Sequence, residues 1–157
     1  MTHLTKFSFG ATSAVITSLA FIIGLSSAIN PKLTIIGTLA VFAIADNISD
    51  SLGIHIFQES DLKKSKVVRT STFYNFFTRV SVTLVFILLV AIFPMGYSIM
   101  FSIIWGFFLL TTLSYYIAKE QKVNPYLAIL QHVAITLVVI IASLFLREWI
   151  TNIFFKI

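Results

Sequence analysis

Long apolar runs separated by short polar breaks dominate this sequence. A helix needs about 20 mostly apolar residues to cross a bilayer. Five runs have this length, and they cover residues 7–28, 33–57, 73–93, 97–118 and 126–146. Three of the breaks contain proline, at Asn30-Pro31, Pro94-Met95 and Asn124-Pro125, and proline lacks the backbone donor that a helix interior requires. The pattern predicts an all-α, polytopic membrane protein in which residues 1–157 form a single domain of five transmembrane helices.

The break between the second and third runs is longer and charged. Residues 58–72 contain Glu59, Asp61, Lys63, Lys64, Lys66 and Arg69. This composition predicts a solvated loop or a short surface helix.

Composition narrows the class of protein further. The chain is 58% hydrophobic and 11% charged, whereas a soluble domain is about 25% charged. The formal net charge is +5, but so few charges cannot cover a water-facing surface, so nucleic acid is not an expected partner. The chain has no cysteine, which excludes thiolate metal sites, iron–sulfur clusters and cysteine nucleophiles.

The distribution of basic residues predicts the orientation in the membrane. Five spans place the termini on opposite sides, and cytoplasmic loops carry an excess of Lys and Arg. The side with the N-terminus carries eight basic residues, and the other side carries Lys32, Arg147 and Lys156. We therefore expect a cytoplasmic N-terminus, a C-terminus outside or in a lumen, and a polybasic connector facing anionic lipid. The sequence does not distinguish a cell membrane from an organelle membrane.

Most of the candidate chemistry lies in the second run. Its segment 45–55 reads ADNISDSLGIH, which places two carboxylates inside an otherwise apolar span. A charge at the bilayer centre costs about 2.5–3.5 kcal/mol on insertion scales, so such side chains face the bundle interior and are functional candidates. At about 100° per residue, Asp46, Asn47, Asp50 and Ser51 share one arc of the helix. Two carboxylates on adjacent turns repel, so one should keep its proton unless a cation is bound.

This group of side chains predicts a metal site. Carboxylate, amide and hydroxyl oxygens suit hard or borderline divalent ions, and a histidine favours iron or manganese. The predicted metal ligands are Asp46, Asn47, Asp50 and His55.

Other runs offer polar groups at a similar depth. A rise of about 1.5 Å per residue places Asp50 about 10 Å and Asp46 about 16 Å from the cytoplasmic end of their span. The same arithmetic predicts a polar chamber in the cytoplasmic half of the bundle. Residues assigned to the translocation path or to proton coupling are Ser13, Thr17, Ser51, Arg79 and His132.

Arg79 also supports a different interpretation. A guanidinium at the depth of Asp50 would pair with it and cancel one negative charge. In that alternative, Asp50–Arg79 is a structural ion pair that fixes helix register in a non-transporting membrane scaffold or partner subunit. An enzyme is not expected, because the sequence has no H-E-x-x-H motif and no serine elbow, so no catalytic residue and no resident cofactor are assigned.

The first two runs resemble the vacuolar iron transporter family. The resemblance rests on the segment 10–17, GATSAVIT, followed by Gly24 and Ala28, and on a polar second helix that ends in Gln58-Glu59. It implies a homodimer whose first helices line a central path and export Fe²⁺ or Mn²⁺ from the cytosol in exchange for protons.

The chain is similar to a short, divergent member of that family. Residues 58–72 are too short for the family's cytoplasmic metal-binding domain, which leaves Gln58, Glu59 and Asp61 as candidates for cytoplasmic metal entry. Ser13 stands where the family has a metal-binding aspartate, and Ser51 stands where it has a glutamate. The expected function is a proton-coupled divalent metal transporter whose carboxylates have moved to Asp46 and Asp50.

Overall fold

The computed structural model consists of five helices. They are α1 (His3–Gly24), α2 (Pro31–Ser60), α3 (Ser65–Ile92), α4 (Met95–Gln121) and α5 (Pro125–Phe154). The structure describes residues 3–60 and 65–154, with the backbone alone at 3–9 and 65–67. Within those ranges it contains no strand, which confirms the all-α prediction.

The helix boundaries follow the predicted proline breaks. Pro31 and Pro125 open α2 and α5, and Pro94 directly precedes α4, because proline is tolerated where a helix has no use for the first donors. Helix α1 ends earlier than predicted, because its last helical residue is Gly24 and residues 25–28 form turns.

The charged break differs from the prediction. Helix α2 continues to Ser60 and α3 begins at Ser65, so most of residues 58–72 extend the two long helices. Asp61 lies outside the described residues. An apolar run marks the part of a helix that suits the bilayer, whereas the helix itself continues as long as its backbone hydrogen bonds do.

Four helices are long and apolar enough to cross a membrane. They are α2, residues Val68–Ile92 of α3, α4 and α5. Helix α1 comprises 22 residues, of which Gly10–Gly24, the part with described side chains, form an apolar helix. These findings fit a multi-pass integral membrane protein, while a fifth span and the direction in which the termini face remain predictions.

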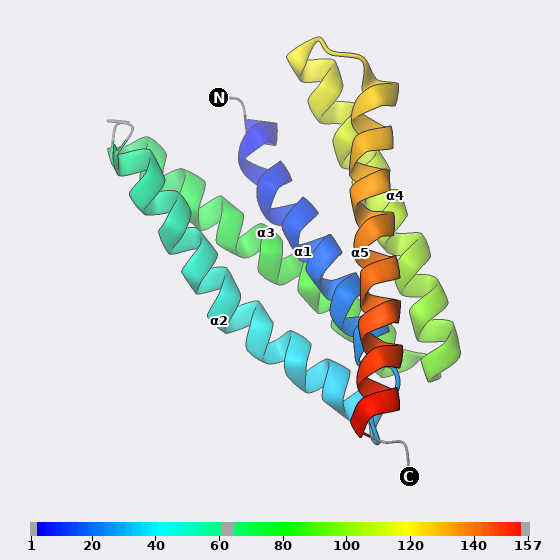
Figure 1. Ribbon diagram of the computed structural model, residues 1–157. Coiled ribbons are helices and arrows are strands. Elements are labelled where there is room, and N and C mark those ends of the chain that lie inside the picture. The colour runs from blue at the N-terminus through cyan, green and yellow to red at the C-terminus, as the bar shows by residue number, and fades with distance from the viewer. Residues whose placement is uncertain (1–2, 61–64, 155–157) are drawn as a thin grey trace.

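Helix α1 lies in the middle of the bundle (Figure 1). It contacts all four other helices, with the α2–α3 hairpin on one side and the α4–α5 hairpin on the other. The two hairpins spread apart toward the end that holds the N-terminus, here called the N-terminal end (Figure 1). The C-terminus and the connections after α1 and α3 lie at the opposite, C-terminal end.

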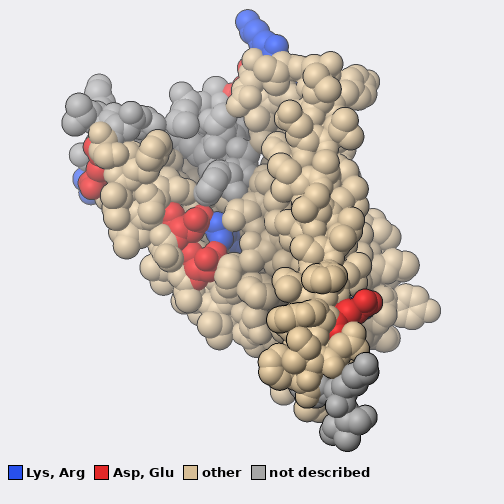
Figure 2. Space-filling view, in the orientation of Figure 1, with Lys and Arg blue, Asp and Glu red and all other residues tan. Residues whose placement is uncertain are grey.

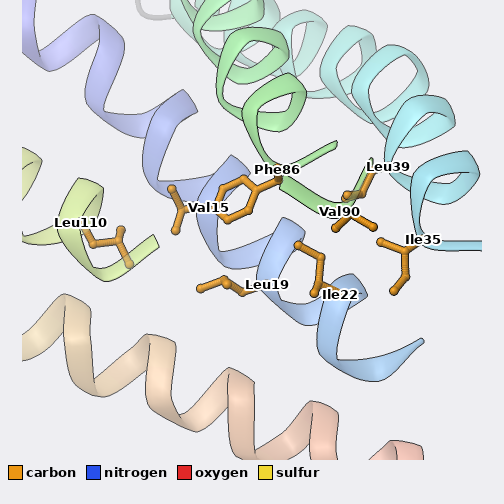
Figure 3. Packing of buried hydrophobic residues seen from close by; sticks show 8 residues of the cluster. All are labelled: Val15, Leu19, Ile22, Ile35, Leu39, Phe86, Val90 and Leu110. Carbon is orange, nitrogen blue, oxygen red and sulfur yellow. The ribbon is translucent and has the colours of Figure 1, made fainter. Parts of the chain in front are cut away.

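The apolar core occupies the half of the bundle nearer the C-terminal end. Figure 3 shows it around α1, and it contains Val15, Leu19, Ile22, Ile35, Leu39, Phe86, Val90 and Leu110. On α4, Gly106 allows close approach, because an added Cβ would lie 2.8 Å from Leu19 Cδ1. Small residues at a helix contact are typical of membrane bundles, where lipid provides no hydrophobic drive for association. The half of the bundle nearer the N-terminal end holds the polar cluster described next.

Candidate functional site

Arg79 is the centre of a polar cluster that joins three helices. Its side chain is buried, with 1% of the residue exposed. Nε donates to Asn47 Oδ1 at 2.6 Å, and Nη1 donates to Ser13 Oγ at 2.9 Å. The guanidinium also forms ion pairs with both carboxylates of α2, through Nη1 to Asp50 and Nη2 to Asp46. We call Ser13, Asp46, Asn47, Asp50 and Arg79 the Arg79 cluster.

The local sequence of α2 explains how three acceptors reach one guanidinium. Asp46, Asn47 and Asp50 lie within little more than one turn, so their side chains project over neighbouring parts of the same face. Asn47 Nδ2 donates to the Ala43 carbonyl at 2.6 Å. This bond fixes the amide, so that its Oδ1 points toward Arg79.

The carboxylates lie at the edge of the cluster while the arginine lies inside it. The Asp46 and Asp50 side chains are 36% and 32% exposed, against 2% for Arg79. Figure 2 shows an acidic patch with a basic group within it on the concave side of the bundle, between the two hairpins. With two carboxylates facing one guanidinium, the cluster carries one uncompensated negative charge when both are ionised.

Two cavities follow α2 from Asp46 toward the C-terminal end. The first, of about 570 Å³, is lined by residues of α2 including Gly37, Thr38 and Asp46. The second, also about 570 Å³, is lined by the start of α2 at Leu33 and Thr34, by the end of α1 and by Arg147 of α5. The lining residues of the two cavities occupy successive turns of α2, and Asp46 of the cluster lines the first cavity.

A buried polar seam extends the cluster toward the N-terminal end, between α2 and α3. Asn75 Nδ2 donates to Ser51 Oγ at 3.4 Å, and Gln58 Nε2 donates to Ser71 Oγ at 2.9 Å. All four residues are buried, and Asn75 Oδ1 and Gln58 Oε1 have no hydrogen-bond partner within the described residues. Gln58, predicted at a cytoplasmic metal entry, is therefore part of a helix contact.

His55 lies apart from the Arg79 cluster. Its Nε2 is 3.2 Å from Glu59 Oε1, one turn further along α2, and its Nδ1 is 3.5 Å from Thr72 Oγ1. Among the described side chains, at residues 10–60 and 68–154, no group of three or more His, Cys, Asp or Glu is placed to hold a metal ion. The structure brings Asp46, Asn47 and Asp50 together, and it fills the space between the carboxylates with a guanidinium.

The residues predicted for the path lie in three places: at the Arg79 cluster, in the seam, and between α4 and α5. Ser13 and Arg79 are in the cluster, Ser51 is in the seam, and Thr17 Oγ1 donates to the Ser13 carbonyl at 2.8 Å. His132 lies between α4 and α5, where its Nδ1 is 2.7 Å from Ser114 Oγ. Since Ser114 Oγ donates its one hydrogen to the Leu110 carbonyl at 2.6 Å, the network assigns a donating N–H to His132 Nδ1.

Helix α3 supplies two buried polar residues, Ser71 and Asn75, that were not predicted from the sequence. Asn75 and Ser71 precede Arg79 by four and eight residues, so the three share one helix face. Polar residues at this spacing before an arginine inside an apolar span indicate a polar helix face, and this pattern could have identified them.

Gly10 sets the distance between α1 and the cluster. A Cβ added there would lie 2.6 Å from Asn75 Oδ1, 2.9 Å from the Asn75 carbonyl oxygen and 3.1 Å from Arg79 Cγ. A backbone oxygen cannot move without shifting α3.

We expect Gly10→Ala to lower the free energy of unfolding by about 1–3 kcal/mol, which is typical of overpacking. Denaturant titration in mixed micelles measures this change.

Gly37→Ala and Gly53→Ala are the matched controls for that substitution. Both glycines are on α2, and an added Cβ meets nothing within 4 Å. They should leave stability unchanged or raise it, because alanine favours helix. Equal stability of Gly10→Ala and Gly37→Ala would contradict the close contact between α1 and α3.

Comparison with known proteins gave no relative from which a family or a function can be read. No family model matches the chain, and no curated protein or solved structure matches it.

Proposed function

We propose that this chain is a proton-coupled transporter of divalent metal ions, with Fe²⁺ or Mn²⁺ as its substrate. The observation that carries the proposal is the charge of the Arg79 cluster. One guanidinium faces two carboxylates inside apolar helices, and the carboxylates border open space. An uncompensated charge in a medium of low dielectric constant is costly, so the cluster favours a mobile cation at Asp46 and Asp50.

Exchange of protons for metal follows from the chemistry of the ligands. A metal ion binds the deprotonated carboxylate, so its arrival releases any proton held there. In the arrangement observed, Arg79 contacts Oδ2 of each carboxylate, and each carboxylate has a second oxygen with which it could contact an ion. The oxygens of Asp46, Asp50, Asn47 and Ser13 are the set that would then hold the ion, and hard divalent ions prefer such oxygens.

The route and the assembly are part of the same proposal. The two cavities along α2 give the direction of movement away from the cluster, toward Arg147 at the C-terminal end. Carboxylates that are one-third exposed are unfavourable against lipid. A second copy of the chain covering the concave side would shield them, and we therefore propose a homodimer.

Metal flux into proteoliposomes tests this function. Wild-type protein should take up Fe²⁺ or Mn²⁺ under an imposed pH gradient and not in its absence. Asp46→Asn and Asp50→Asn each remove a charged ligand while keeping the shape of the side chain, and each should lower the flux about tenfold or more.

Glu148→Gln is the matched control, because Glu148 is a carboxylate of α5 that is 71% exposed and belongs to neither the cluster nor the cavities. It should transport like the wild type. A silent wild type, or full activity in both aspartate variants, would contradict the proposal.

A second candidate function is a non-transporting scaffold or partner subunit. The observation that favours it is the number of bonds to Arg79, which contacts four side chains on α1 and α2. A guanidinium held in this way fixes the rotation of three helices relative to one another. That structural role would explain the buried arginine without any transport.

A further inference from the structure

A groove lies between α2 and α3, on the side of their contact away from the Arg79 cluster. At about 100° per residue, Ile48, Leu52 and His55 project from the face of α2 opposite to Asp46. Together with Arg69, Phe73 and Phe76 of α3 they line a cavity of about 460 Å³. That volume lies in the range of small-molecule sites.

The chemical character of the groove changes along its length. Arg69 lies near the start of α3, and Phe73 and Phe76 follow about 6 Å and 10 Å further along the helix. On the antiparallel α2, His55 lies toward the same end as Arg69, and Ile48 lies about two turns deeper. One end is therefore cationic and polar, and the other end is aromatic and aliphatic.

Arg69 is exposed, and its guanidinium has no hydrogen bond or ion pair to any described residue. The neighbouring histidine is already paired with Glu59 and Thr72. Arg79 and Arg147, by comparison, both have protein acceptors. A guanidinium binds phosphate oxygens in a bidentate geometry, so Arg69 has the chemistry to bind a phosphate group.

We propose that this groove binds one anionic phospholipid, with its phosphate at Arg69 and an acyl chain along Phe73 and Phe76. Phe73 is 59% exposed, and a chain seated beside it would cover apolar surface that a free anion would leave bare. Arg69 lies one helical turn before Phe73, where the apolar run of α3 begins, and the polar edge of a membrane span lies at the level of the lipid head groups. None of the five residues of the Arg79 cluster lines this groove.

Native mass spectrometry of the purified full-length chain tests the site. Phosphatidylglycerol and phosphatidylcholine of identical acyl chains are titrated into wild type, Arg69→Gln and Lys119→Gln. The control removes an exposed basic residue of the last turn of α4, outside the groove. Wild type should prefer phosphatidylglycerol, and Arg69→Gln should weaken that binding about tenfold or more, while Lys119→Gln leaves it unchanged.

Two further arms make the result decisive. Phe76→Ala should weaken the binding of long-chain phosphatidylglycerol, because it removes part of the contact with the acyl chain. Glycerol phosphate alone should not compete with phosphatidylglycerol, because it has no acyl chain. Equal binding of the two lipids, an unchanged Arg69→Gln variant, or an equal loss in Lys119→Gln would overturn the proposal. A thermal unfolding midpoint of Arg69→Gln equal to that of the wild type excludes misfolding as the cause of lost binding.

Discussion

Replacing Arg79 by glutamine should lower the free energy of unfolding by about 3–5 kcal/mol, as is typical when one partner of a buried ion pair is removed. The substitution leaves Asp46 and Asp50 facing each other with no cation between them. It also removes the bonds that tie α1 and α2 to α3 through Ser13 and Asn47. Denaturant titration in mixed micelles measures the loss.

Neutralising the carboxylates should recover most of that loss. In the triple variant Arg79→Gln, Asp46→Asn, Asp50→Asn, three amides replace three charges and can still form hydrogen bonds with one another. Breaking one side of a buried pair is costly, whereas replacing both sides by neutral groups is often tolerated. A triple variant as unstable as Arg79→Gln would show that the charge of the carboxylates does not cause the loss.

Arg147→Gln is the control for a general effect of removing an arginine. Its side chain is 27% exposed and lies 3.8 Å from Glu148, so the pair is partly solvated. Partly exposed pairs contribute about 0–1 kcal/mol. A loss as large as that of Arg79→Gln would contradict the distinction drawn between the two arginines.

The polar arc of α2 was predictable because helical periodicity alone determines it. Asp46, Asn47 and Asp50 fall on one face whatever the other helices do, and the structure brings them together at Arg79. The pairing of Arg79 with Asp50 was also predictable as an alternative, since both residues fall at one depth. That Asp46 binds the same guanidinium depends on how α3 is rotated against α2, which periodicity within one helix does not specify.

His55 shows the limit of reasoning from one helix. It lies in the same polar segment as Asp50, but its imidazole pairs with Glu59 and Thr72. His55 is nine residues from Asp46, about two and a half turns, so its side chain lies on the opposite face of α2, where Glu59 is 3.2 Å from its imidazole. The lengths of α2 and α3 were underestimated for a related reason, since their polar ends remain helical beyond the apolar run.

Exchanging the two charges of the Asp50–Arg79 pair should separate transport from scaffolding. In the double variant Asp50→Arg with Arg79→Asp, an opposite pair persists between α2 and α3 and Asp46 keeps a cationic neighbour. Asp50→Arg places two guanidiniums beside one carboxylate, and Arg79→Asp places three carboxylates together, so both single variants should be strongly destabilised. The double variant should recover most of that stability, because opposite charges again face each other.

Metal flux through the double variant distinguishes a transporter from a scaffold. The exchange places a fixed cation on α2 at the exposed edge of the site, where Asp50 is 32% exposed in the wild type. A divalent ion would then meet a positive charge at its ligand position, so we expect flux under a pH gradient to fall to the level of empty liposomes. Wild-type flux with restored stability would contradict the role of Asp50 as a ligand. Wild-type protein that moves no metal, together with restored stability on exchange, would favour the scaffold, because a structural pair depends on the attraction between its charges and not on which helix carries each one.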